Sequence, residues 1–415
     1  MTDNRSLSLT IALALLLTAS LARAQEWPGW RGPERDGTVP AAQAPATWPE
    51  AFAPAWRVEI GEGYSSPVVS GGRVFVHSRR GDLEIVTALD LESGGRLWRH
   101  DYPARFVQNT IVPTALPGPF ATPAVDGGRV FTLGAGGILS SWDAASGDPV
   151  WRNDYSASVH VSGLFCGTAA SPLVDRGRLI VQVGSDPGGG RVLGLDPATG
   201  AEIWAWRGVG PGYASPILIE VDGHRQLVTL TESSIVGLDA ADGTLLWSAP
   251  FTDEWHENIM TPVWTGTNLV VSGPRRGTHA FTIHRRERGW DVAPAWSNPG
   301  LTMYMTSPVL ADGIVYGHAS TRAGQFVALE AATGTVRWSS EGREGEFASA
   351  LLAGDDLLLL TGDAELLVVE PTPAAFAVSH HYDVADGVTW TVPVPLPDGL
   401  LVRDATGLAR LVAAD

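Results

Sequence analysis

A short phrase that recurs along the chain places the strongest limit on how it can fold. The stretch GLDPATGAEIW at 194–204 carries an acidic residue, a Gly four positions later and a Trp four positions after that. The same spacing returns in four more stretches, 88–98, 141–151, 237–247 and 328–338. A fixed phrase repeated every few tens of residues is typical of one supersecondary unit copied along a chain. The sequence therefore predicts a repeat architecture.

A second marker indicates the number of units. It consists of a hydroxyl residue followed by Pro and aliphatic residues, as in SSPVV at 65–69. Its copies are spaced by about 42–56 residues, and the last two are weaker. The eight positions are Pro67, Pro123, Pro172, Pro216, Pro262, Pro308, Ala350 and Pro393. Eight markers predict eight units.

Each unit has the pattern of four short strands. In residues 66–102, three apolar or alternating runs are separated by Gly turns and followed by a strand that carries Trp98. The 48 glycines and 29 prolines among 415 residues favour many short strands joined by turns. Four antiparallel strands in about 40–45 residues are a propeller blade, and four to eight blades close into a ring. We therefore predict an all-β fold, an eight-bladed β-propeller.

The repeated phrase has a structural explanation in such a ring. The acidic side chain can accept hydrogen bonds from backbone N–H groups of the turn that follows it. The Gly supplies a positive φ at little cost, and the Trp can lie flat between neighbouring blades. We assign these docking positions a structural rather than a catalytic role: Asp90, Gly94, Trp98, Asp143, Gly147, Trp151, Asp196, Gly200, Trp204, Asp239, Gly243, Trp247, Gly334, Trp338 and Trp56.

The two ends of the chain are expected to complete one blade together. Trp56 precedes the first marker, whereas the eighth unit ends without a Trp. A strand around 55–60 can therefore pair with one around 408–412 and close the ring, which leaves no unpaired edge. Units five and seven depart from the pattern, because Trp296 follows a long hairpin and unit seven lacks the Trp.

The N-terminus has the features of a secretory signal. An apolar run ends at the small-residue cleavage pattern Ala22-Arg23-Ala24. We expect residues 1–24 to be a cleaved signal peptide, 25–49 an N-terminal extension and 50–415 the propeller. Within the extension, WPGWRGPERDG is expected to pack on the outside or across one face of the ring. Cys166 is the only cysteine, so neither a lipid anchor after the apolar run nor an intramolecular disulfide can form.

Charge and hydropathy argue against two kinds of partner, nucleic acid and the membrane interior. A net charge of −17 argues against sequence-independent nucleic-acid binding, which needs a basic surface. No later segment has the roughly 18 unbroken apolar residues that a membrane-spanning helix needs. We expect a periplasmic or secreted monomer that binds a protein, peptide or glycan in the cell envelope, with no nucleic-acid partner and no membrane span.

These motifs resemble those of a known superfamily. The phrase A/G-x-D-x-x-T/S-G-x-x-x-W is similar to the tryptophan-docking repeat of the pyrroloquinoline quinone (PQQ) propellers, over about residues 50–415. Residues 26–37 resemble the W-P-x-W-R-G-P-x-R-D-G opening of secreted bacterial PQQ-binding-like β-propeller repeat proteins. The resemblance implies two classes of function: quinoprotein alcohol dehydrogenases, and non-enzymatic binding scaffolds similar to BamB, the outer-membrane β-barrel assembly factor. The fold alone does not choose between them.

The resemblance also implies what a cofactor site would contain. Quinoprotein dehydrogenases of this type share an adjacent Cys-Cys pair above the cofactor and Glu, Asn and Asp ligands for calcium. With Cys166 alone the pair cannot form, and no stretch matches the calcium-ligand motifs. We therefore expect no cofactor and no metal, with PQQ and calcium as the alternative.

Candidate ligand-binding residues lie in the loops that lead into the markers, because these loops open around the axis on one face of a propeller. Two of these loops, 105–120 and 156–170, are long, as functional loops often are. The candidate residues are Tyr64, His160, Tyr213, His256, Glu257, Asn258 and Tyr304. Each also has a structural interpretation, since the aromatic residues can pack at the channel mouth and WHEN at 255–258 can be a solvated loop.

Three functional hypotheses follow. The favoured one is a non-enzymatic scaffold that binds a protein, peptide or glycan across the loops. The second is a PQQ-dependent quinoprotein dehydrogenase. The third is a hydrolase or lyase in which His256, Glu257 and Asn258 act as metal ligands or acid–base groups. No catalytic residue is assigned.

Overall fold

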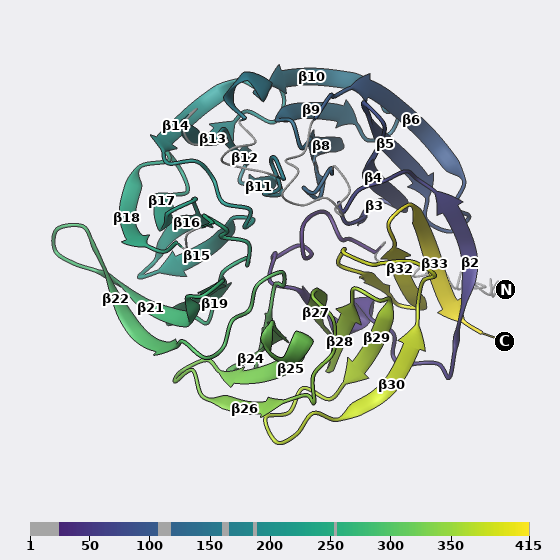
Figure 1. The fold of residues 1–415 in the computed structure, drawn as a ribbon. Coiled ribbons are helices and arrows are strands. Elements are labelled where there is room, and N and C mark those ends of the chain that lie inside the picture. The colour runs from purple at the N-terminus through teal and green to yellow at the C-terminus, as the bar shows by residue number, and fades with distance from the viewer. Residues whose placement is uncertain (1–24, 107–117, 160–165, 186–188, 253–254, 415) are drawn as a thin grey trace, which may run out of the picture.

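Eight β-sheets surround a central axis in the computed structural model of the protein (Figure 1). The structure describes residues 25–106, 118–159, 166–185, 189–252 and 255–414. Seven sheets have four strands and one has five. Each blade contains four antiparallel strands, which follow one another in sequence from the axis outward except in blade 8, where β2 is the outermost strand. The predicted all-β, eight-bladed propeller is confirmed. The signal-peptide prediction for 1–24 lies outside the described residues.

The first four blades consist, from the axis outward, of the following strands. Blade 1 has β3 (Val68–Ser70), β4 (Arg73–Arg80), β5 (Leu83–Asp90) and β6 (Arg96–Pro103). Blade 2 has β7 (Ala124–Asp126), β8 (Arg129–Leu133), β9 (Ile138–Asp143) and β10 (Pro149–Asp154). Blade 3 has β11 (Leu173–Asp175), β12 (Arg178–Val183), β13 (Gly190–Leu195) and β14 (Glu202–Gly208). Blade 4 has β15 (Ile217–Val221), β16 (His224–Leu230), β17 (Ser234–Asp239) and β18 (Leu245–Pro250).

The remaining blades follow the same order. Blade 5 has β19 (Val263–Trp264), β20 (Asn268–Gly273), β21 (Gly277–Arg285) and β22 (Trp290–Asn298). Blade 6 has β23 (Val309–Ala311), β24 (Ile314–Ala319), β25 (Gln325–Glu330) and β26 (Val336–Ser339). Blade 7 has β27 (Ala348–Ala353), β28 (Asp356–Thr361), β29 (Glu365–Val369) and β30 (Val378–Asp383). Blade 8 has β31 (Val394–Leu396), β32 (Gly399–Arg403), β33 (Gly407–Ala413) and β2 (Phe52–Glu59). The other elements are β1 (Thr38–Val39), η1 (Ala41–Gln43), η2 (Ser156–Ser158) and η3 (Thr321–Ala323).

The hydroxyl residue of the marker connects neighbouring blades near the axis. The Ser66 hydroxyl accepts a hydrogen bond from the N–H of Val392 in blade 8, and Thr122 accepts one from the N–H of Ser66. The series continues as Ser171 accepts from Thr122 and Ser215 accepts from Ser171. Because these buried N–H groups need a partner, the hydroxyl at this position of one blade satisfies an N–H group of the preceding blade each time.

The tryptophan of one blade packs on the glycine of the following blade. The Trp98 indole lies on Gly147, where a Cβ would be 2.5 Å from the ring, and its Nε1 donates to the Ala144 carbonyl. Gly147 therefore needs both its φ of +79° and the absence of a side chain. The same contact recurs in four more pairs: Trp56–Gly94, Trp151–Gly200, Trp204–Gly243 and Trp296–Gly334.

The acidic residue of the phrase holds the turn that contains this glycine. Oδ1 of the aspartate accepts a hydrogen bond from a backbone N–H two or three residues later, and the same bond forms in four blades: Asp90, Asp143, Asp196 and Asp239. In the sixth unit, Glu330 instead accepts from the Thr333 hydroxyl. The turn is thus preorganised to receive the preceding indole.

Blades 5 and 7 change the pattern, as their sequences do. Trp247 of blade 4 donates to Gln226 within its own blade, because blade 5 has no docking glycine. Trp338 of blade 6 donates to the Thr372 carbonyl of blade 7. Trp296, which sequence analysis left out of the docking set, donates to Ala331 and joins blade 5 to blade 6.

The N-terminal strand closes the ring, as predicted. β2 pairs antiparallel with β33, with Val58 opposite Leu408 and Trp56 opposite Arg410. The Trp56 indole donates to the Leu91 carbonyl of blade 1 at 3.0 Å. The first and last parts of the chain therefore share one blade and its joint with the next.

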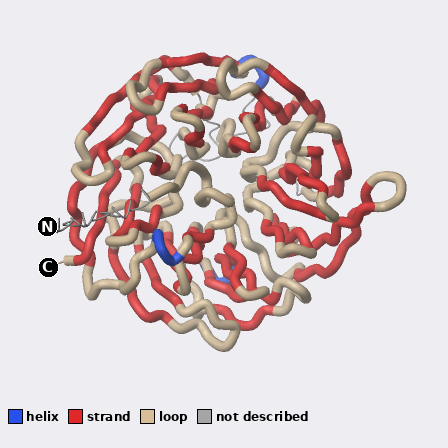
Figure 2. Tube along the Cα trace, turned by 180° about the vertical axis from the view of Figure 1, so that it is seen from behind, coloured by secondary structure: helices blue, strands red, loops and turns tan. Residues whose placement is uncertain are grey.

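Residues 25–39, which precede β2 in the chain, lie in the middle of the ring in both views (Figures 1 and 2). We call residues 25–39 the axial segment. Its Trp27 is 1% exposed, and its end forms β1, which pairs in parallel with β27 as the fifth strand of that sheet. The expectation that WPGWRGPERDG packs on the outside or across one face is therefore wrong. Arg31 and Arg35 are buried and bonded to inner-strand carbonyls, Trp27 packs in the core, and the Trp30 indole donates to Thr261.

The axial segment bonds to every blade. Its backbone pairs with Val69 of blade 1, Val125 of blade 2 and Leu352 of blade 7. Its side chains bond to the other five blades, at Pro172 (blade 3), Pro216 (blade 4), Thr261 (blade 5), Pro308 (blade 6) and Pro395 (blade 8). A single stretch of chain thus connects all eight sheets at their inner ends.

Candidate functional site

The loops before the markers bring one residue from each of several blades together around the axis, and we call this side of the ring the loop face. The Tyr64 N–H donates to the Pro119 carbonyl, so the entry to blade 1 is bonded to the entry to blade 2. In the same way Tyr213 and Ala214 donate to the Asn258 carbonyl. Neighbouring loops therefore hold each other in place.

Four aromatic rings from four consecutive blades form a stacked row on this face. Phe347 stacks on Trp390 with ring centroids 5.4 Å apart and planes at 4°. Trp390 contacts Tyr64 at 5.5 Å, and Tyr64 stacks on Phe120 at 5.5 Å. All four side chains are half-buried. We call this row the aromatic arc; it presents a continuous apolar edge across blades 7, 8, 1 and 2.

The other half of the loop face is polar. The Tyr304 hydroxyl donates to Glu257 Oε2 at 2.6 Å, which links the entries to blades 5 and 6. The Tyr213 hydroxyl accepts a hydrogen bond from the Cys166 N–H at 3.3 Å. Burial raises the pKa of Tyr213, with further contributions from the Cys166, Glu257 and Glu232 side chains. Phenols and carboxylates thus occupy the part of the loop face that belongs to blades 3 to 6.

Residues 255–258 do not form one cluster of polar groups. Asn258 is 2% exposed, and its amide donates to the Thr231 and Phe251 carbonyls, so it braces the loop. Glu257 bonds to Tyr304, whereas His256 is exposed and has a φ of +60°. The structure brings Tyr213, Glu257 and Tyr304 near one another, whereas Tyr64 lies in the aromatic arc. That these residues bind a ligand stays a prediction. His160 lies outside the described residues.

Sequence analysis missed part of the face. Phe120, Phe347 and Trp390 were not candidates, although each lies three residues before a marker, as Tyr64 and Tyr213 do. This constant offset is the signal that could have identified the aromatic arc. The buried arginines of the axial segment had no such signal, because their partners are backbone carbonyls.

One group in the described part of the chain has metal-ligating atoms close together. Glu365 lies opposite Asp383 across β29 and β30, and the donor atoms of these two residues and His381 are within 4.8 Å of one another. His381 Nε2 is 3.3 Å from Glu365 Oε1. Imidazole and carboxylate donors suit a divalent ion. Exposed acidic groups of this kind are common without an ion, and we assign this group no role.

His318, at the end of β24, makes stability depend on pH. Burial lowers its pKa from 6.5 to about 4. Below pH 6.5 the unfolded chain binds a proton that the folded chain does not take up until about pH 4, so stability is lost as pH falls through this range, by at most roughly 3 kcal/mol. His318→Gln should flatten the dependence of the urea midpoint on pH between 6.5 and 4. His284→Gln, at an exposed position, is the control, and equal slopes in all three proteins would contradict the assignment.

The architecture defines a class of protein: an eight-bladed propeller with tryptophan docking and a preorganised loop face. Residues 50–110, 82–340 and 296–398 match the family described as outer membrane protein assembly factor BamB. The chain belongs to this family. In the described residues, none of the helices has the length and apolar character to cross a bilayer.

Two relatives in this family carry the same description. The protein from Yersinia pestis is 23% identical over 234 residues, which cover 53% of this chain and 56% of that protein. The protein from Moranella endobia (strain PCIT) is 25% identical over 361 residues, 86% of this chain and 76% of that protein. The match to the Yersinia protein thus spans little more than half of its length.

Solved structures show the same fold. BamB from Moraxella catarrhalis has a TM-score of 0.62 and 16% identity, over 87% of this chain and all of that chain. Quinohemoprotein alcohol dehydrogenase from Comamonas testosteroni has a TM-score of 0.65 and 15% identity, over 94% and 81%. At these identities the likeness concerns the fold alone, and the same fold occurs in BamB and in an alcohol dehydrogenase.

Proposed function

We propose that the chain is a non-enzymatic binding scaffold of the bacterial cell envelope that holds a protein partner on its loop face. The observation that carries this proposal is the aromatic arc. Half-buried aromatic side chains held by their neighbours are typical of the residues that dominate protein–protein binding. A continuous apolar edge beside a polar half suits a partner surface with an apolar centre and polar flanks.

Family membership supports the same class of function. The relatives are described as outer membrane protein assembly factors, a role that consists of binding other proteins of the envelope. For this chain an envelope location also agrees with the signal peptide expected over residues 1–24. The proposal prefers a protein partner to a glycan because Phe347 stacks on Trp390 and Tyr64 stacks on Phe120, so less ring face remains for a sugar.

The proposal includes function without PQQ or calcium. It is supported by the single Cys166, which cannot supply the disulfide of the quinoprotein dehydrogenases, and by the axial segment, which fills the axis with Trp27, Arg31 and Arg35. The Asn258 amide donates to two backbone carbonyls and holds the loop. The residues present therefore do not fit a quinone site. The separate partners of Glu257 and Asn258 likewise argue against an acid–base centre at 255–258.

Site-specific crosslinking in the native envelope tests this proposal. A photoreactive residue at Phe347, in the aromatic arc, should give a discrete adduct with one envelope protein, whereas one at the exposed Leu97 of β6 should not. With the purified partner, Trp390→Ala should raise the Kd at least 10-fold, as expected for a binding hot spot. An adduct from both positions, or an unchanged Kd in a variant that melts like wild type, would overturn the proposal.

A further inference from the structure

The two arginines of the axial segment are held in an unusual way. Arg35 donates from Nε to the Pro216 carbonyl and from Nη1 to Pro172, both at 2.9 Å, and from Nη2 to Ser171 at 3.1 Å. Arg31 donates to the carbonyls of four residues: Ser307, Pro308, Ala350 and Asp36. Both guanidinium groups are buried. In the described part of the chain, neither forms an ion pair with a carboxylate within 4.0 Å.

The acceptors of these arginines come from the repeat itself. Three of the six acceptors in the blades are marker prolines, and two are serines that directly precede a marker proline. The remaining acceptor is Ala350, which occupies the proline position of the marker in blade 7. We call the oxygens of Ser171, Pro172, Pro216, Ser307, Pro308 and Ala350 the carbonyl ring. A proline has no N–H, so this part of the inner strand offers acceptors without a competing donor. Converging carbonyls with no donors favour a cation, and the five-donor fork of a guanidinium suits several of them at once.

We propose that the carbonyl ring is a binding site for a turn-forming peptide with arginines four residues apart, and that residues 25–39 are its intramolecular occupant. Arg31 and Arg35 have φ values of +59° and +60°, and the N–H groups of Gly32, Arg35 and Gly37 bond to carbonyls within the segment, so the occupant is folded into turns. Backbone bonds to Val69, Val125 and Leu352 near the ends of the segment add main-chain contacts. This site is separate from the aromatic arc, and the inference does not depend on the proposed partner of the loop face.

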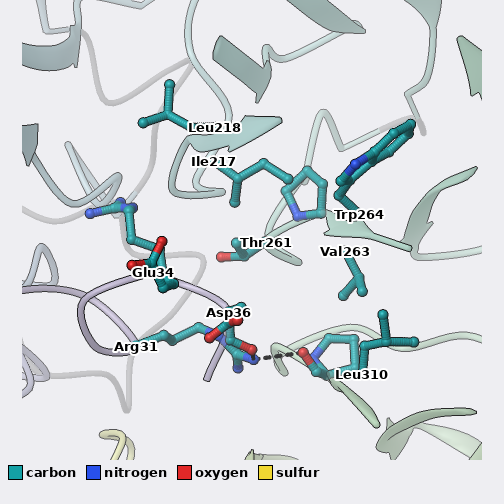
Figure 3. A pocket seen from close by; sticks show the side chains of 12 residues that line it. Arg31, Glu34, Asp36, Ile217, Leu218, Thr261, Val263, Trp264 and Leu310 are labelled. Atoms are coloured by element: carbon teal, nitrogen blue, oxygen red, sulfur yellow. Dashed lines mark hydrogen bonds between the residues drawn. The ribbon is translucent and has the colours of Figure 1, made fainter. Parts of the chain in front are cut away.

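The acidic residues of the segment contribute little to this recognition. Figure 3 shows Glu34 and Asp36 beside a cavity of about 300 Å³, whose opposite wall includes Ile217, Leu218 and Trp264. Both carboxylates are exposed, whereas Arg31 reaches the Pro308 carbonyl in the same view. The arginines rather than the acids therefore select the occupant.

The connection to β2 explains why the segment occupies its own ring. Residues 40–51 connect the axial segment to β2, the outermost strand of blade 8. This tether gives the segment an effective concentration at the carbonyl ring on the order of millimolar. To displace the axial segment, a peptide of equal affinity from another chain would have to exceed this concentration, unless the tether is cut. Exchange with an external peptide should therefore become measurable once the tether is cleaved.

Cleavage after folding makes this measurement possible. A protease site inserted between Ala46 and Thr47, both exposed, can be cut in the native protein so that the ring is never folded without its segment. Native mass spectrometry should then detect the segment still bound. A fluorescent synthetic copy of residues 25–39 should replace it, with saturable binding by anisotropy.

Peptide variants separate recognition from adventitious adhesion. Arg35→Ala in the labelled peptide should weaken binding at least 10-fold, and Arg35→Lys should not restore it, because an ammonium lacks the guanidinium fork. Glu34→Gln should bind like the parent peptide. Equal binding by the Arg35→Ala and parent peptides would overturn the proposal, as would failure of the parent peptide to displace the cut segment.

If displacement is too slow to follow, the cut protein can carry Arg31→Ala and Arg35→Ala in its own segment. This segment should be lost on dilution to micromolar concentration, and retention equal to wild type would overturn the proposal.

Discussion

Replacing Arg31 and Arg35 together by alanine should cause a large loss of stability, more than about 5 kcal/mol in the free energy of unfolding. Each guanidinium is the hydrogen-bond partner of at least three buried or partly buried carbonyls, which would lose that partner. A hydrogen bond to a charged group contributes roughly 1.5–3 kcal/mol, and a buried group left unsatisfied costs about 1–3 kcal/mol. Urea denaturation followed by tryptophan fluorescence measures the loss.

The exposed acid between the two arginines provides the control. Glu34→Ala lies in the same segment but faces the cavity, and it should change the free energy of unfolding by less than about 0.5 kcal/mol, as surface substitutions usually do. If the double arginine variant unfolds at the same urea concentration as Glu34→Ala, the axial segment does not stabilise the ring. The eight sheets would then be held together by their lateral joints alone.

The second large effect is expected at the joint that closes the ring. Trp56→Ala should cost roughly 3–5 kcal/mol, typical of truncating a packed aromatic side chain. Gly94→Ala should break the same joint from the other side, because its Cβ would lie 2.6 Å from the Trp56 indole. In the double variant the indole is absent, so the second substitution should cost much less than it does alone. Thermal and urea unfolding of the four proteins complete the double-mutant cycle.

A glycine with a similar backbone conformation isolates the steric part of this effect. Gly72 has a φ of +73° and Gly94 one of +68°, but a Cβ on Gly72 would meet nothing within 4 Å. Gly72→Ala should therefore show only the cost of the left-handed conformation, about 1–2 kcal/mol. If Gly94→Ala costs no more than Gly72→Ala, or if the effects of Trp56→Ala and Gly94→Ala simply add, the indole does not pack on the glycine as described.

Much of the ring could be predicted because its joints are built from local patterns. The Asp–Gly–Trp spacing identified the turns and the outer strands, and the eight proline-type markers identified the number of blades, without any knowledge of contacts. The position of Trp56 before the first marker, together with the missing Trp of the eighth unit, predicted the pairing of β2 with β33. What local spacing did not show is that each glycine receives the indole of the preceding blade rather than its own.

The candidate site was less predictable, because a loop's sequence does not show where its polar groups point. His256, Glu257 and Asn258 are adjacent in the chain, yet Asn258 points inward to two carbonyls, Glu257 meets Tyr304, and His256 faces solvent. The aromatic arc depends on residues from four different blades. Its members share an offset from the markers, but only ring closure brings Phe347 and Phe120 into one row.

The sequence by itself determined the fold class, the number of blades and the way the ring closes, since each follows from short-range periodicity repeated many times. Only the tertiary structure decided the place of residues 25–39. Their partners are backbone carbonyls or N–H groups in seven blades and the Thr261 hydroxyl in blade 5. Every residue type carries a carbonyl, so a pattern of side chains does not indicate most of these contacts. In the sequence, Arg31 and Arg35 resemble residues of a solvated surface segment. They become interior residues because blades 3, 4, 6 and 7 direct backbone carbonyls toward them.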